Sequence, residues 1–147
     1  MEADKSAAAF TVNVGCSLDP KPLYGVAHFL EHMLFMGSEK YPVENEYSTF
    51  ISNNSGSSNA YTDLTHTNYH FDCSNETFGE GLDRFSWFFK APTLKEESTE
   101  REMKAVDSEF KQTINNDGWK FKMMILLNAH EKSYLNTFDC GNEETLK

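Results

Sequence analysis

Basic residues are scarce in this 147-residue sequence, in which 13 Lys and Arg stand against 23 Asp and Glu and give a formal net charge of −10. A chain this acidic repels polyanionic nucleic acids and anionic membrane surfaces unless a local basic patch compensates, and no Lys/Arg run supplies such a patch. We therefore expect neither a nucleic acid nor a membrane among its partners.

Long apolar runs are also missing. Stretches such as residues 85–89 and 123–127 fall far short of the roughly 20 residues needed to cross a bilayer. The first residues are acidic, and residues 7–10 are too short for the apolar core of a signal peptide. These features predict a soluble protein that is not secreted by that route.

Cysteine is rare, and its spacing excludes a dense disulfide framework. Cys16, Cys73 and Cys140 are an odd number of residues without a closely spaced pair. Such a pattern favours free thiols in a reducing compartment. We therefore expect a cytoplasmic location.

Hydrophobic periodicity predicts an α+β fold in which an antiparallel or mixed sheet packs against helices. The expected strands are 8–14, 57–62 and 68–73, the last two paired as a hairpin, and the expected helices are 24–36, 42–53, 76–90, 96–114 and 119–129. The length suits one domain with one core. An apolar stripe on the third helix is assigned to that core: Phe78, Leu82, Phe85, Phe88 and Phe89.

The most informative motif is His28-Phe29-Leu30-Glu31-His32, which lies within the first expected helix. At about 100° per residue, side chains four apart project from one helix face, so both imidazoles can share one ion. Glu31 lies on the same side, where a carboxylate can take a proton from a metal-activated water. The spacing thus predicts a zinc site with Glu31 as general base.

A catalytic zinc normally takes three protein ligands, so two histidines require a third donor from elsewhere in the chain. The acidic helix at 96–114 is the best source. Glu102 and Glu109 are seven residues apart and face the same way, so either could bind the metal while the other orients a histidine.

The alternative interpretation is a solvated helix face with two histidines and no metal. A chance His-x-x-Glu-His match is expected in about one or two per cent of such chains. A carboxylate on an exposed helix, such as Glu109 taken alone, is ordinary. His66, His70 and His130 have no partner at helical spacing and are interpreted as surface or hydrogen-bonded residues.

Longer runs carry a family resemblance. They are GVAHFLEHMLFMGS at 25–38, GSSNAYT at 56–62, NYHF at 68–71 and AVDSE at 105–109. In this order they closely resemble the insulysin and nardilysin group of the pitrilysin family, the inverted-zincin (inverzincin) metallopeptidases. The resemblance covers most of the chain and makes the alternative without a metal improbable.

The resemblance implies a partial pitrilysin-type domain, of the fold shared with LuxS and the mitochondrial processing peptidase. It further implies one Zn²⁺ per chain held by His28, His32 and Glu109, with Glu31 as the catalytic residue and Glu102 as an acid that orients a histidine. The run at 57–62 would be a sheet edge that pairs with the substrate backbone, so that Asn59 and Ala60 contact the peptide. The implied activity is hydrolysis of short or unfolded polypeptides inside a closed chamber of two halves.

Family members are several times longer than this chain. We therefore expect residues 1–147 to be a single but incomplete N-terminal catalytic domain. Two alternatives to an active peptidase follow. The chain could be a noncatalytic fragment or accessory subunit that pairs with a longer homologue or a second half in trans, or it could come from an incomplete gene model with no role of its own.

Overall fold

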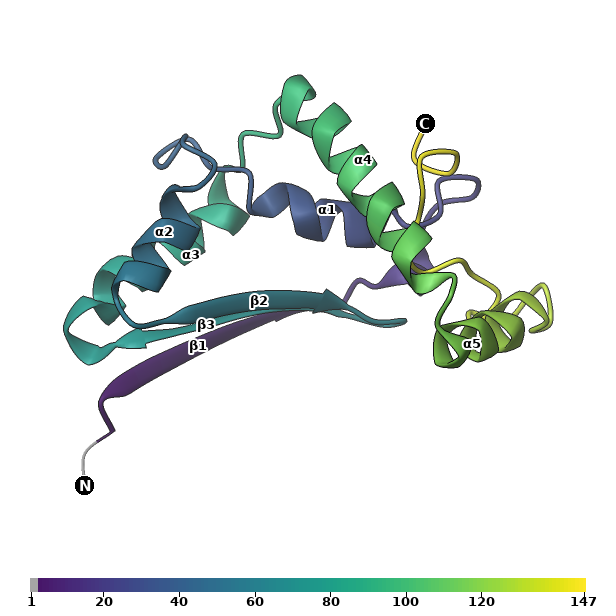
Figure 1. Ribbon diagram of the computed structural model, residues 1–147, viewed down its shortest axis with the longest axis horizontal. Coiled ribbons are helices and arrows are strands. Elements are labelled where there is room, and N and C mark those ends of the chain that lie inside the picture. Colours follow the sequence, from purple (N-terminus) through teal and green to yellow (C-terminus); the bar gives the residue numbers. More distant parts are fainter. Residues whose placement is uncertain (1–2) are drawn as a thin grey trace.

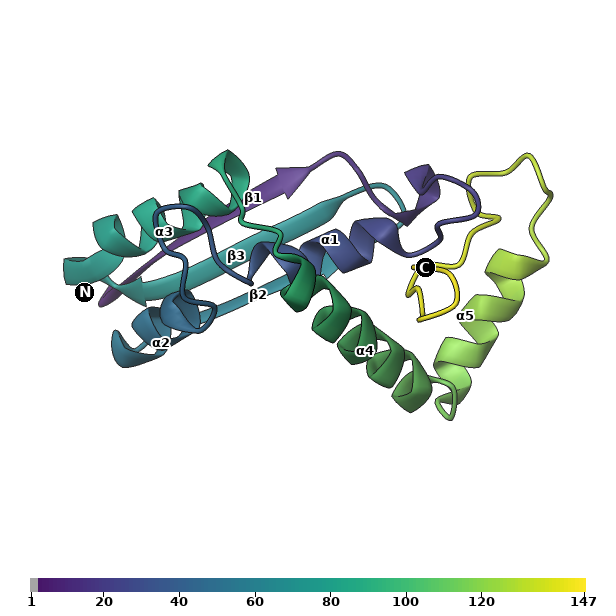
Figure 2. The same ribbon diagram turned by 90° about the horizontal axis from the view of Figure 1, so that it is seen from above.

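The computed structural model describes residues 3–147 as one antiparallel sheet with helices on one of its faces (Figure 1). In chain order the elements are β1 (Lys5–Val12), α1 (Val26–Leu34), α2 (Glu46–Asn53), β2 (Ser57–Thr62), β3 (Thr67–Ser74), α3 (Phe78–Lys90), α4 (Glu96–Thr113) and α5 (Asp117–Leu127), with 3-10 turns η1 (Cys16–Leu18) and η2 (Asn75–Thr77). Helices α1, α2 and α3 cover the sheet, α4 crosses over α1, and α5 lies beyond the end of the strands (Figures 1 and 2). The expected α+β class is confirmed.

The strand order is β1-β3-β2, and both pairings are antiparallel. Alternation along β3 gives the sheet two different faces, because successive side chains of a strand point to opposite sides. Tyr69, Phe71 and Cys73 are buried toward the helices, whereas His70 on the opposite face is exposed. Within residues 3–147, β2 pairs only with β3, so its other side is a sheet edge.

The core lies between the sheet and the three covering helices. It is largely aromatic, and several of its ring pairs, such as Tyr47 with Phe71 and with Phe88, meet edge to face, an arrangement that the ring quadrupoles favour. Its buried members are Leu34, Tyr47, Ile51, Tyr69, Phe71, Cys73, Phe85 and Phe88. Leu82 was expected in this core, but it is 41% exposed, because it lies on the outer side of α3.

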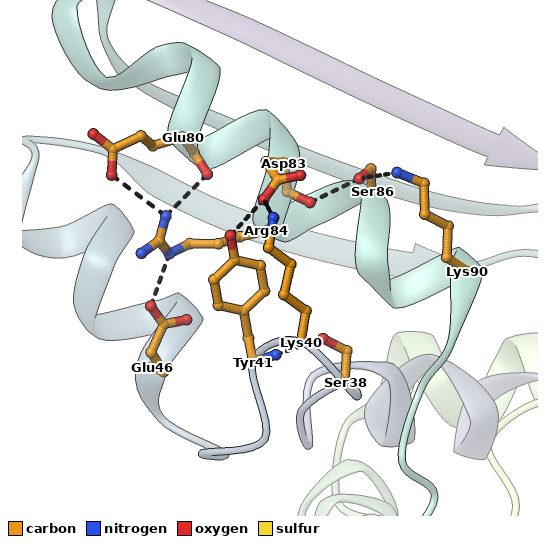
Figure 3. A network of polar contacts seen from close by, with 9 residues as sticks. All are labelled: Ser38, Lys40, Tyr41, Glu46, Glu80, Asp83, Arg84, Ser86 and Lys90. Atoms are coloured by element: carbon orange, nitrogen blue, oxygen red, sulfur yellow. Dashed lines mark hydrogen bonds and ion pairs between the residues drawn. The ribbon is translucent and has the colours of Figure 1, made fainter.

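A polar network fastens the segment after α1 to α3 (Figure 3). Asp83 on α3 accepts hydrogen bonds from Lys40 and Tyr41, and Arg84 donates to Glu46 at 2.8 Å. The Arg84 guanidinium also lies over the Tyr41 ring. Because α1 ends just before this segment, the network fixes the far end of the helix that carries the histidine motif.

Two element boundaries differ by more than two residues from those expected. β1 spans Lys5–Val12 instead of 8–14, because the small residues at its start pair with β3 through the backbone and show no hydrophobic pattern. α2 begins at Glu46 and not at residue 42. Glu44 instead binds side chains of α4, accepting hydrogen bonds from Ser98 and Arg101, both at 2.6 Å.

The three cysteines are free and buried. Burial raises the pKa of the Cys16 and Cys140 thiols to about 12, with nearby carboxylates adding to the effect. Among residues 3–147, no helix is both long enough and apolar enough to cross a membrane.

Candidate metal centre

The N-terminus of helix α1 is capped by a residue that is not adjacent to it in the sequence. Gly25 precedes the helix with a φ of 87°, a conformation that favours glycine, and has no side chain to cap the first turn. Asp19 supplies the cap from a distance, because its carboxylate accepts hydrogen bonds from the amides of Gly25 at 2.7 Å and Ala27 at 3.0 Å. Asp19 thereby fixes the first turn of α1, which contains His28.

Three donor atoms meet where α4 crosses α1. The two Nε2 atoms of His28 and His32 are 3.3 Å apart, and Oε2 of Glu109 lies 3.8 Å from the first and 3.4 Å from the second. Ligands held about 2.0–2.2 Å from a tetrahedral zinc are about 3.3–3.5 Å from one another. The two separations that involve His32 fall within this range, and the 3.8 Å between His28 and Glu109 is slightly longer, so the three atoms could hold one metal ion.

The other ring nitrogen of each histidine has a partner. Nδ1 of His28 is 2.7 Å from the backbone carbonyl of Cys140, and Nδ1 of His32 is 3.4 Å from Oε2 of Glu102. A carbonyl only accepts hydrogen bonds, so this contact requires a proton on Nδ1 of His28, and the neutral ring with that proton has its lone pair on Nε2. Two imidazole nitrogens and a carboxylate oxygen directed at one point are a donor set for a cation.

The two acids of α4 differ in position, which their spacing in the sequence could not decide. Glu109 lies beside the Nε2 atoms, and its side chain is 48% exposed. Glu102 lies against Nδ1 of His32, and its side chain is 13% exposed. The structure thus brings Glu109 to the shared donor cluster and Glu102 behind one histidine.

Charges within the cluster shift the pKa values of His32 and Glu109. The hydrogen bond to Glu109 raises the pKa of His32, although burial opposes this effect. The same hydrogen bond lowers the pKa of Glu109, again against burial. Each group thus favours the charged state of the other.

Glu31 lies beside the cluster and is 8% exposed. Its carboxylate accepts a hydrogen bond of 2.6 Å from the hydroxyl of Thr62, the last residue of β2. It also lines a cavity of about 290 Å³ together with His32, Phe35, Met36, Ser48, Ser58, Asn59, Ala60 and Glu102. An acid, a histidine and part of the β2 edge therefore border one small space.

The sequence model of the insulinase family, peptidase family M16, matches residues 1–133. The chain belongs to this family. The A-factor-processing enzyme of Saccharomyces cerevisiae is 48% identical to it over 145 residues, and insulin-degrading enzyme of Homo sapiens is 46% identical over 144 residues. The crystal structure of pitrilysin covers 99% of this chain with a TM-score of 0.94 and 32% identity.

The M16 chain is short beside these relatives. The matched region covers 99% and 98% of this chain but only 14% of each of the two relatives. It covers 16% of the pitrilysin chain. The motif, the third acid and the expected substrate strand thus lie within about a seventh of the length of the relatives.

Three contacts of this M16 site were not predicted from the sequence. Asp19 caps α1, Thr62 binds Glu31, and the Cys140 carbonyl binds His28. One indication of the Thr62 contact was present in the sequence. Thr62 lies two residues beyond Ala60 on the expected substrate strand, so the two side chains point to the same face. A backbone carbonyl carries no signal in the sequence.

The remaining histidines lie outside the cluster, as expected. His66 packs against the Tyr61 ring, and His70 is within 3.1 Å of the Asn68 side chain on the outer face of the sheet. His130 accepts a hydrogen bond from the amide of Lys132. Local contacts therefore account for each of them.

Proposed function

We propose that this chain is the catalytic segment of a zinc-dependent M16 endopeptidase that hydrolyses peptide bonds of short or unfolded polypeptides. The observation that carries the proposal is the convergence of Nε2 of His28, Nε2 of His32 and Oε2 of Glu109 beside the buried Glu31. These three residues would hold one Zn²⁺, and Glu102 would orient His32.

Zinc bound at this point would supply a Lewis acid that polarises a carbonyl and makes water more acidic. Glu31 would accept the proton of the attacking water and later return it to the leaving amine. The Thr62 hydroxyl would hold the Glu31 carboxylate in place during both transfers. Water is the nucleophile in this scheme, so we expect no covalent acyl-enzyme.

The β2 edge is the proposed substrate site. A peptide in extended form could add to this edge by main-chain hydrogen bonds, which bind many sequences. Asn59 and Ala60 lie on β2 and border the cavity that also contains Glu31 and His32. A peptide on this strand would therefore pass directly beside the proposed general base.

Metal analysis and peptide cleavage test the proposal together. We expect one zinc per chain in wild type and in Glu31→Gln, and much weaker zinc binding in Glu109→Gln. Cleavage of a quenched peptide should be lost in Glu31→Gln. If wild type binds zinc no better than Glu109→Gln, the metal site is wrong. If Glu31→Gln cleaves as well as wild type, the role of Glu31 is wrong.

A second candidate function is that of an accessory or binding subunit that pairs with a longer homologue through the β2 edge, since among residues 3–147 β2 pairs only with β3. Reconstitution separates the two functions. The chain is mixed with a longer M16 relative from which the matching segment has been deleted. Cleavage that appears only in the mixture, and that Glu31→Gln abolishes, would show that the chain supplies the site and the longer protein the remaining walls.

Two further expectations belong to this proposal. Residues 1–147 would form one incomplete catalytic domain, and the protein would be cytoplasmic. Limited proteolysis tests the first, because a single domain should give one protected core and not two separate fragments. Fractionation of cells with an antibody against the chain tests the second.

A further inference from the structure

We propose that residues 137–145, here called the 137–145 loop, position His28 for metal binding through the backbone carbonyl of Cys140. This inference rests on the proposed function, because it concerns the same metal site. It assigns a role to a segment in which the sequence shows no periodicity. Cys140 would act through its backbone and not through its thiol.

The loop is fastened on both sides of Cys140 to residues that precede α1. The hydroxyl of Thr137, which is buried, donates to the carbonyl of Cys16 at 3.0 Å. The hydroxyl of Thr145 donates to the carbonyl of Tyr24 at 2.8 Å. Both partners are more than a hundred residues away in sequence, so these bonds hold the loop against the start of the motif helix.

A close contact between two glycines sets the distance between loop and helix. A Cβ atom on Gly25 would lie 2.2 Å from Cα of Gly141, and a Cβ atom on Gly141 would lie 3.0 Å from Cα of Gly25. Both residues also have positive φ angles, 87° and 76°. Only glycine satisfies both requirements, so neither position accepts a larger residue without moving the two segments apart.

This contact lies immediately beside the carbonyl that binds His28. Cys140 precedes Gly141, and Gly25 lies one helical turn before His28. A shift of the loop away from Gly25 would therefore lengthen the 2.7 Å distance between Nδ1 of His28 and the Cys140 carbonyl. His28 would then lose the partner that keeps its proton on Nδ1 and directs its Nε2 lone pair at the metal.

Two variants test the loop, and two serve as controls. Gly141→Ala adds the Cβ atom that the contact excludes. Thr145→Val removes the bond to Tyr24, and the bond that the same hydroxyl accepts from the Asn142 amide, without adding a Cβ atom between the two glycines. It keeps the test valid if Gly141→Ala does not fold. Gly79→Ala is the control for a glycine exchange, since nothing lies within 4 Å of its added Cβ. Cys140→Ala removes the thiol and leaves the carbonyl.

The first measurement is the His28 tautomer in metal-free protein, read from nitrogen-15 NMR of the imidazole. We expect the proton on Nδ1 in wild type, Gly79→Ala and Cys140→Ala, and a loss of this signature in Gly141→Ala and Thr145→Val. The second is the zinc dissociation constant, measured by competition with a chromophoric chelator. It should rise about 10–100-fold in the two loop variants and stay unchanged in the two controls.

The results separate this inference from the proposed function. If folded Gly141→Ala and Thr145→Val keep both the tautomer and the zinc affinity of wild type, the positioning role is overturned. A loss of affinity in Cys140→Ala equal to that in Gly141→Ala would overturn the role of the backbone carbonyl. If wild type shows the tautomer but binds no zinc, the proposed function fails while the contact between the loop and His28 stands.

Discussion

Glu31 is a carboxylate with little access to water, and Thr62 gives it a short hydrogen bond across the gap between α1 and β2. Hydrogen bonds to charged groups contribute about 1.5–3 kcal/mol, and a buried acceptor that loses its donor is destabilising. The contact also joins the proposed base to the proposed substrate strand. A change at Thr62 should therefore affect stability and catalysis together.

For this reason Thr62→Val should lower the free energy of unfolding by about 1.5–3 kcal/mol, because the isosteric methyl group leaves Glu31 without its donor. Thr62→Ser keeps the hydroxyl and should lose much less. Urea unfolding of both variants, alone and combined with Glu31→Gln, gives the coupling energy of the pair. Equal losses in Thr62→Ser and Thr62→Val would contradict the assignment.

The sequence could predict the cluster at the level of single residues only in part. His28, Glu31 and His32 are close in sequence, so helical spacing alone brings them to one face. Glu102 and Glu109 could not be ranked in this way, because two residues seven apart point in the same direction. Their difference depends on the angle at which α4 crosses α1, which no local pattern encodes.

At the scale of elements, periodicity predicted strands well where one face packs against the core, as in β3, where Tyr69, Phe71 and Cys73 alternate and the expected 68–73 lies within the observed Thr67–Ser74. It failed where side chains are used for other contacts. Glu44 was expected in the first turn of a helix, but it binds the side chains of α4. Leu82 was expected in the core because its spacing is right, although α3 has no neighbour on that side.

Helix α3 contains a matched pair of glycines that tests how tightly it packs on the sheet. A Cβ atom at Gly79 meets nothing within 4 Å, whereas one at Gly81 would lie 3.0 Å from the buried Phe71 ring. We expect Gly79→Ala to raise stability by about 0.4–1 kcal/mol through a loss of unfolded-state entropy. Gly81→Ala should gain less or be destabilising, because the Phe71 ring must move. Thermal and urea unfolding of the two variants measure both effects. A Gly81→Ala variant as stable as Gly79→Ala, or more stable, would contradict the prediction.

At the scale of the whole molecule, buried groups predict how stability depends on alkaline pH. Burial raises the pKa of both Cys16 and Cys140 from 9.0 to about 12, and it also raises the pKa of Tyr47 and Tyr69. The folded state therefore keeps protons that the unfolded state releases above about pH 9.

The stability that these thiols contribute should accordingly be constant below pH 9 and be lost between pH 9 and 12, by up to about 1.4 kcal/mol per pH unit for each thiol. Urea unfolding of metal-free protein from pH 7 to 11 measures this slope. Cys16→Ala should reduce the slope by about one proton although it lowers stability at neutral pH. A slope that does not change in Cys16→Ala would show that Cys16 does not titrate in this way.

Removal of the metal should loosen the contact between α4 and α1 while the sheet persists. Without zinc, Glu109 is joined to the two imidazoles only by its own contacts of 3.8 and 3.4 Å, and its side chain is 48% exposed. We expect chelation to lower the melting temperature and to increase amide hydrogen exchange in α4 more than in β3. Glu109→Gln should show the same exchange pattern with or without chelator. If amide exchange in α4 and β3 is the same with and without chelator, the metal does not join the two helices.

The proposed ligands are divided between α1 and α4, and His32 and Glu109 are 77 positions apart in the sequence. A metal bound by both helices would act as a removable cross-link around this long stretch of chain, which contains the whole of β2, β3 and α3. In chain-entropy terms, closing a loop of this length is comparable to a disulfide worth about 4–5 kcal/mol. Resistance of the chain to proteolysis would then follow the concentration of free zinc, so that the ion proposed for catalysis would also protect the protein from being cleaved.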